Sequence, residues 1–123
     1  MMLTFLHERL ANTMILFSLV AGLWGLLTYF RRRGVTANYW GILIIGEILY
    51  AAQGLLGIAL WLGGERPGRT IHLLYGAVAL ITFPAYYAAS KGRDDRRAAL
   101  IYGLLGLFLA GIGARAMSTG AVP

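Results

Sequence analysis

The segment YWGILIIGEILYAAQGLLGIALWL, residues 39–62, decides the fold. It is apolar almost throughout, and Glu47 is its one charged residue. An apolar segment of this length crosses the roughly 30 Å hydrocarbon core of a bilayer as an α-helix. A helix suits that environment because it satisfies all its backbone hydrogen bonds internally. We therefore expect residues 39–62 to span a membrane.

The rest of the chain repeats this pattern. The 123 residues are 59% hydrophobic and 13% charged, which is more apolar surface than a soluble domain of this size could bury. The apolar residues form predicted spans at about 4–30, 39–62, 71–90 and 98–117, and short connections make neighbouring spans antiparallel. The sequence predicts an all-α fold, in which residues 1–123 form one integral membrane domain, a four-helix up-down-up-down bundle.

The basic residues lie mainly between the spans and predict the topology. The loops at 31–38 and 91–97 together carry seven Lys or Arg residues, against four on the other side. Because positive loops stay in the cytoplasm, we expect a multi-pass protein of the cell membrane with these two loops inside and both termini outside. The net charge of +6 is then a sign of topology and does not indicate binding to nucleic acid. The absence of cysteine excludes disulfides and thiolate metal sites.

Two histidines are the main candidates for chemistry, since polar side chains inside spans are costly. His7 and His72 open the first and third spans, which run in the same direction, so the two side chains lie at similar depth near the outer surface. If these helices are diagonal in the bundle, the imidazoles can face each other as two axial ligands of one haem b. The alternative is that each histidine binds lipid headgroups or loop backbone at the membrane surface.

Further polar residues could support such a site. Arg9 and Arg69, with Arg66, lie on the outer side and could bind haem propionates, or else lipid phosphate. Glu47 is an intramembrane carboxylate with Tyr50 about one helical turn away, and we expect it to form a helix-to-helix hydrogen bond.

Small and aromatic residues form patterns of their own. One face of the first span could give a flat macrocycle clearance or simply allow close helix packing, through Ala11, Ser18, Gly22 and Gly25. A similar stripe in the fourth span has no histidine and is expected to serve packing, through Gly103, Gly106, Ala110 and Gly113. Aromatic residues near span ends are expected to anchor the protein at the membrane interface: Trp24, Tyr29, Tyr39, Trp40 and Trp61.

Three stretches resemble one half of the haem A synthase family, whose members contain two four-helix bundles of cytochrome b type. They are HERLANTMILFSLVAGLWGL at 7–26, AAQGLLGIALWLGG at 51–64 and RTIHLLYGAVALI at 69–81. The resemblance implies that His7 and His72 are axial ligands and that Gln53 packs beside the porphyrin. The cysteine pair, the second half and the carboxylate ahead of the first histidine helix of that family are absent. The resemblance therefore supports haem binding by this chain more strongly than it supports the synthase reaction.

Three functions follow as hypotheses. The first is a small membrane cytochrome that transfers electrons, together with a larger membrane partner. The second is an accessory subunit of a respiratory or photosynthetic complex without a cofactor, or with His72 bound to a chlorophyll-type pigment. The third is a half-size haem A synthase acting as a homodimer. No Ser/His/Asp set and no phosphate-binding loop is present, so the sequence favours a non-enzymatic role in contact with membrane lipid.

Overall fold

The computed structural model describes residues 2–120 and confirms the all-α four-helix fold. The helices are α1 (Met2–Phe30), α2 (Ala37–Leu62), α3 (Ile71–Ala89) and α4 (Arg96–Gly120). All four are long and apolar enough to cross a membrane, so the chain has the build of a multi-pass membrane protein. Each predicted span lies on one helix, with boundaries within three residues of those expected.

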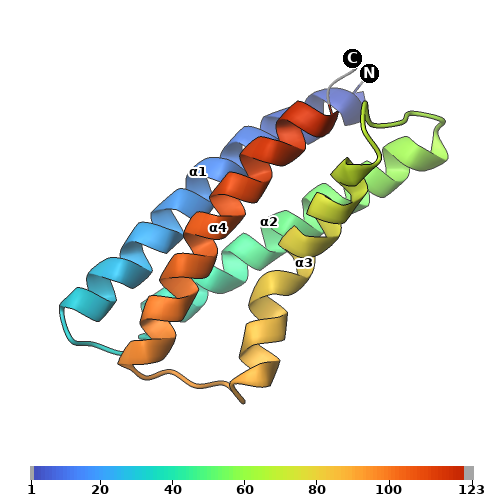
Figure 1. The fold of residues 1–123 in the computed structure, drawn as a ribbon. Helices are drawn as coiled ribbons and strands as arrows, with labels where there is room; N and C mark the ends of the chain where they lie inside the picture. The colour runs from blue at the N-terminus through green and yellow to red at the C-terminus, as the bar shows by residue number, and fades with distance from the viewer. Residues whose placement is uncertain (1, 121–123) are drawn as a thin grey trace.

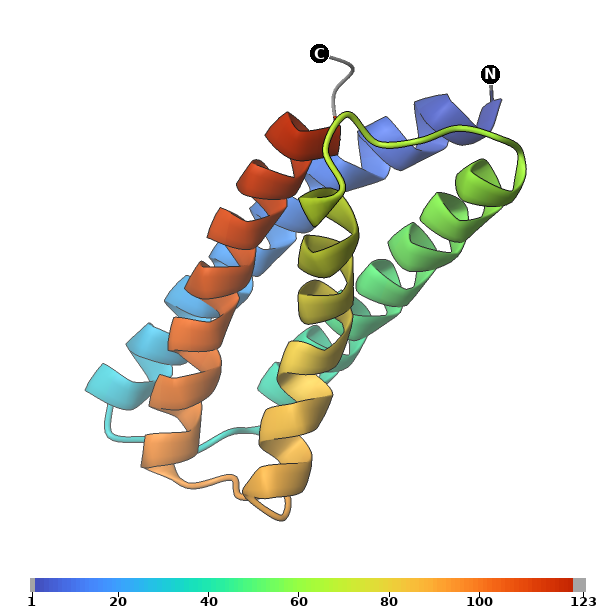
Figure 2. The same ribbon diagram turned by 45° about the vertical axis from the view of Figure 1, so that its right-hand side comes forward.

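The helices form an antiparallel bundle in which each has two neighbours (Figure 1). α1 packs on α2 and α4, and α3 packs on the same two helices. α1 and α3 therefore lie diagonally, as the sequence-based haem hypothesis requires. Figure 2 shows that α1 begins and α4 ends at the same end of the bundle, which also carries the loop 63–70. We call this the terminal end, and we call the opposite end, with the loops between α1 and α2 and between α3 and α4, the basic end.

Glycines bring α1 and α4 into direct backbone contact. A Cβ atom added to Gly106 would lie 2.7 Å from the backbone nitrogen of Gly22, and one added to Gly103 would lie 2.8 Å from that of Leu26. The packing role predicted for the fourth-span glycines is confirmed. Gly22 and Gly25 of α1 serve the same contact. Of the two alternatives for these glycines, close helix packing is therefore the one observed, and clearance for a macrocycle is not, because α4 and the Tyr39 hydroxyl fill the space beside them.

An aromatic core occupies the basic half of the bundle. Tyr39 is fully buried and its hydroxyl donates to the Ala21 carbonyl of α1 at 2.8 Å. Trp40 packs edge to face on Tyr87 and Tyr102, with ring centroids 5.7 and 5.5 Å away. The expectation that Tyr39 and Trp40 anchor the protein at the membrane interface is therefore wrong. Both residues are near the start of a span in the sequence, but they are on the face of α2 that points into the bundle.

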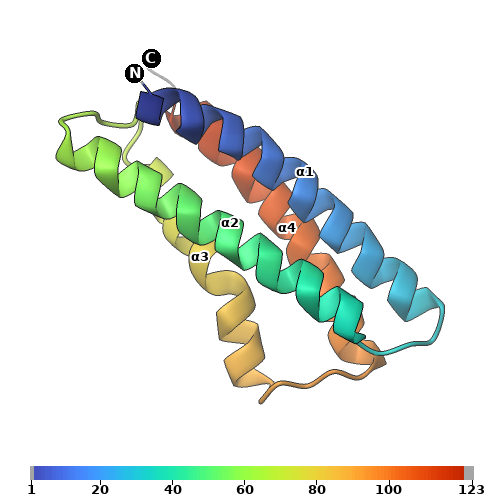
Figure 3. The same cartoon turned by 180° about the vertical axis from the view of Figure 1, so that it is seen from behind.

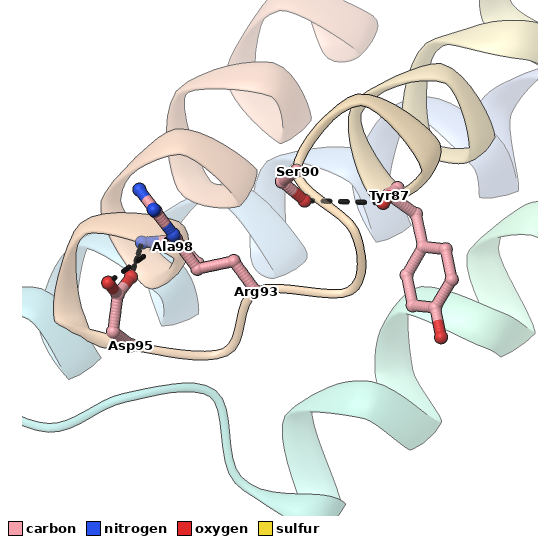
Figure 4. A network of polar contacts seen from close by, with 5 residues as sticks. All are labelled: Tyr87, Ser90, Arg93, Asp95 and Ala98. Carbon is pink, nitrogen blue, oxygen red and sulfur yellow. Dashed lines mark hydrogen bonds and ion pairs between the residues drawn. The ribbon is translucent and has the colours of Figure 1, made fainter.

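Local hydrogen bonds fix the helix ends at the basic end. The hydroxyl of Thr36 accepts from the Tyr39 backbone at 3.2 Å and caps α2. Asp95 caps α4 by accepting from the Ala98 N–H at 2.9 Å, while Arg93 lies 3.6 Å from the same carboxylate (Figure 4). The Val35 N–H donates to the Asp94 carbonyl at 2.7 Å and joins the two basic loops.

Candidate functional site

The His72 side chain is held by the end of α4. The loop before α3 is fixed first, because the Arg69 N–H donates to the Thr119 carbonyl at 2.8 Å. His72 Nδ1 then lies 2.7 Å from the Ala116 carbonyl oxygen, which can only accept. Nδ1 must therefore carry the proton, and the neutral ring presents its lone pair at Nε2. This is the orientation that a backbone carbonyl commonly gives to a metal-binding histidine.

His7 lies on α1 at the same end, against α2. The side-chain amide of Gln53 donates to the His7 carbonyl at 2.8 Å and so ties the two helices together. The ring lies close to the α2 backbone, since a Cβ atom at Gly57 would make an ordinary van der Waals contact with His7 Cε1 at 3.5 Å. His7 Nδ1 is buried and has no hydrogen-bond partner among residues 2–120. A buried nitrogen without a partner is costly, and a metal or another ligand could satisfy it.

The structure brings the two imidazoles together across the bundle diagonal. Their ring centroids are 6.2 Å apart and their planes are inclined by 67°. Two imidazoles on opposite sides of one metal ion, each with a metal–nitrogen bond of about 2.0 Å, have centroids about 6 Å apart. The observed separation is compatible with this value and is also that of an ordinary edge-on ring contact. Gly120 is part of the arrangement, because a Cβ atom there would lie only 2.7 Å from His72 Cε1.

The three arginines predicted as supporting residues lie at the terminal end, with exposed side chains. Arg9 lies over the Phe5 ring, with its guanidinium carbon 5.3 Å from the centroid. Arg66 donates to the Trp61 carbonyl at 2.6 Å and stacks on the indole, while the backbone of Arg69 holds the loop as described above. The structure thus leaves the guanidinium groups of Arg9 and Arg69 accessible at the end that carries the histidines.

Glu47 lies away from the histidines, and the prediction of a helix-to-helix hydrogen bond is wrong for its Oε1 atom. That oxygen is buried and unpartnered among the residues that the structure describes. Tyr50 bonds instead to Ser18 of α1, and Gln53 to the backbone of His7. Glu47 lines a cavity in the basic half of the bundle that sequence reasoning missed. The available signal was the helical spacing of Trp40, Leu43, Ile44 and Glu47, which puts these residues on one face of α2.

The chemistry open to the histidine pair is restricted by its ligand number. No group of three or more His, Cys, Asp or Glu side chains that could hold a metal ion occurs within residues 2–120. Zinc sites use three or four protein ligands, so two histidines alone make an incomplete zinc site. A porphyrin supplies four equatorial nitrogens itself, and two axial imidazoles then complete the coordination of its iron. The residues present therefore fit haem better than a bare metal ion.

Comparisons of the chain with protein-family models, with curated proteins and with solved structures found no match in any of the three.

Proposed function

We propose that this protein is a small membrane cytochrome that holds one b-type haem between His7 and His72 and transfers electrons, in association with a larger membrane partner. The observation that carries the proposal is the 6.2 Å separation of the two imidazole centroids, on helices that lie diagonally in the bundle. Two side chains 65 positions apart in the sequence meet here with a centroid separation compatible with two axial ligands of one iron, and this supports the proposal.

The surroundings of the two rings support axial ligation. The Ala116 carbonyl fixes the protonated nitrogen of His72, which leaves the other nitrogen for a metal. His7 has a buried ring nitrogen without a partner, and Gln53 holds the backbone of that residue against α2. A bound haem would supply one-electron redox chemistry, and the chain supplies ligands, orientation and an apolar environment.

Arg9 and Arg69 are proposed to bind the haem propionates. Both side chains are exposed at the terminal end, where a carboxylate could approach either guanidinium group. A bidentate arginine–carboxylate pair is both stronger and more directional than a contact with lysine. Replacing both residues by glutamine should weaken haem retention and leave the axial ligation spectrum unchanged.

The terminal end is proposed to face away from the cytoplasm, because the loops at 31–38 and 91–97 carry most of the basic residues. The chain has no native cysteine, so single cysteines can report its orientation directly. A cysteine at Glu65 should react with a membrane-impermeant maleimide in intact cells, whereas one at Arg33 should react only after permeabilisation. The reverse pattern would invert the topology.

The decisive experiment is an absorption spectrum of protein purified from haem-replete cells, oxidised and reduced. We expect a Soret band and the spectrum of a low-spin bis-imidazole haem. The variants His7→Gly and His72→Gly should each lose that spectrum, and added imidazole should restore it by filling the vacated ligand position. Restoration separates ligation from a merely structural role of the histidines.

Other results would favour the other hypotheses. A colourless preparation that migrates with a larger complex in mild detergent would indicate an accessory subunit without a cofactor. Strong red absorption would indicate a chlorophyll-type pigment on His72. Conversion of a haem precursor by a homodimer in a synthase-deficient strain would indicate a half-size haem A synthase. Each of these outcomes would overturn the cytochrome proposal.

A further inference from the structure

A second candidate site is the cavity of about 600 Å³ in the basic half of the bundle. It is lined by residues of α2, α3 and the start of α4. Figure 3 shows that α3 diverges from α2 toward the basic end of the bundle. Its walls include the rings of Trp40, Phe83, Tyr87 and Tyr102, with Pro84 beside them and Glu47 as the charged lining residue. A cavity of this size is large enough for a small organic molecule.

Two polar atoms in this region lack partners within residues 2–120. They are Oε1 of Glu47 and the hydroxyl of Tyr102, both buried. A buried polar atom without a hydrogen bond costs free energy, and more so in a membrane, where the surrounding lipid tails offer no hydrogen bonds. Both residues line the same cavity, but a water-sized molecule reaches neither of these two atoms, so a ligand oxygen would meet Glu47 or Tyr102 only after the side chain rotates toward the cavity.

The composition of the walls restricts the ligand further. Four aromatic rings around one cavity favour a flat ring, which can stack on them or meet their edges. An acyl chain would fill the same space but would leave Glu47 and Tyr102 without partners. A ligand that enters from the bilayer must also be lipid-soluble.

We propose that this cavity binds a membrane-soluble ring compound of the quinone class, with a ring oxygen hydrogen-bonded to Glu47. A carboxyl group suits both forms of such a ring, since it accepts from a quinol hydroxyl and, when protonated, donates to a quinone carbonyl. Trp40 and Phe83 hold the ring from α2 and α3. This site lies apart from the histidine pair, so the proposal goes beyond haem binding and does not depend on it.

Tryptophan fluorescence provides a local test, because Trp40 lines the cavity and Trp61 lies near the terminal end. Two single-tryptophan proteins would be compared in detergent, one keeping Trp40 and one keeping Trp61. Decylubiquinone should quench Trp40 in a saturable manner and Trp61 only in proportion to its concentration in the micelle. In the Trp40 protein, Glu47→Gln should raise the half-saturation concentration by about tenfold.

Controls make each outcome decisive. Glu65→Gln removes an exposed carboxylate in the loop at the terminal end and should leave quenching unchanged. Decylbenzene, which has the tail and a ring but no oxygen, should compete at least about tenfold less well than decylubiquinone. The proposal fails if Trp40 quenching does not saturate, if Glu47→Gln has no effect in a protein with unchanged helix content, or if decylbenzene competes equally. Retention of the Soret band in Glu47→Gln would show that a failure here leaves the haem proposal intact.

Discussion

Substitution of Gly103 by alanine tests the closest part of the bundle, where α4 touches the backbone of α1. The added Cβ atom would lie 2.8 Å from Leu26 N, 2.9 Å from Gly22 O and 3.0 Å from Gly25 C. All three are backbone atoms, so no side-chain rotation can make room. Ordinary contacts of a Cβ atom begin near 3.4 Å, and α1 and α4 must therefore separate by roughly half an ångström.

The expected effect on stability combines two opposite terms. Forcing an extra methyl group into a close-packed contact costs about 1–3 kcal/mol. Alanine is the better helix former and offsets up to about 1 kcal/mol of that cost. We expect Gly103→Ala to lower the free energy of unfolding by about 1–2 kcal/mol.

Gly111→Ala is the matched control on the same helix. A Cβ atom at Gly111 would meet nothing within 4 Å, so this variant gains helix propensity without any clash. Both variants would be purified in detergent, and unfolding would be followed by far-ultraviolet circular dichroism during heating and during titration with SDS. We expect Gly111→Ala to be at least as stable toward heat and SDS as the unmodified protein. Gly103→Ala should be less stable than both.

The reasoning would be refuted if Gly103→Ala were as stable as Gly111→Ala. Equal stability would mean that α1 and α4 do not approach as closely as the glycine contacts indicate. It would also weaken the haem proposal, because α4 carries the Ala116 carbonyl that orients His72.

Three further substitutions test other contacts. Asp95→Ala removes the cap of α4 and should cost about 1 kcal/mol in thermal unfolding, whereas Asp94→Ala should cost much less because only its backbone carbonyl is used. Tyr39→Phe removes a buried hydrogen bond between α2 and α1, while the Ala21 carbonyl keeps its bond within α1, so the variant should cost about 0.5–1.5 kcal/mol in the same assay. Gly120→Ala places a methyl group 2.7 Å from His72 Cε1, so it should displace the ring and reduce the haem content of the purified protein; unchanged haem content would argue against the site.

The membrane fold was predictable because it depends on local properties of the chain. Each span is recognised by its own length and apolarity, and the short loops leave only antiparallel neighbours. The glycine stripe of α4 was also read correctly, since small residues at helical spacing favour close packing wherever they occur. The similar depth of His7 and His72 in the bundle could be predicted by counting residues along two spans that run in the same direction.

The partners of the polar side chains were not predictable in the same way. Glu47 was expected to form a hydrogen bond to another helix, yet its Oε1 has no partner among residues 2–120 and the side chain lines a cavity, while the neighbouring Tyr50 bonds to Ser18. Tyr39 was expected at the membrane interface, yet it is buried against α1.

The sequence by itself determined that the chain has four segments long and apolar enough to cross a membrane, because the transfer of each segment from water to lipid depends on that segment alone. Only the tertiary structure decided which helices are diagonal, which face of each points inward, and therefore that His7 meets His72. These features depend on the rotation of each helix about its own axis. That rotation is set by contacts between residues far apart in the chain, such as the glycines that join α1 to α4.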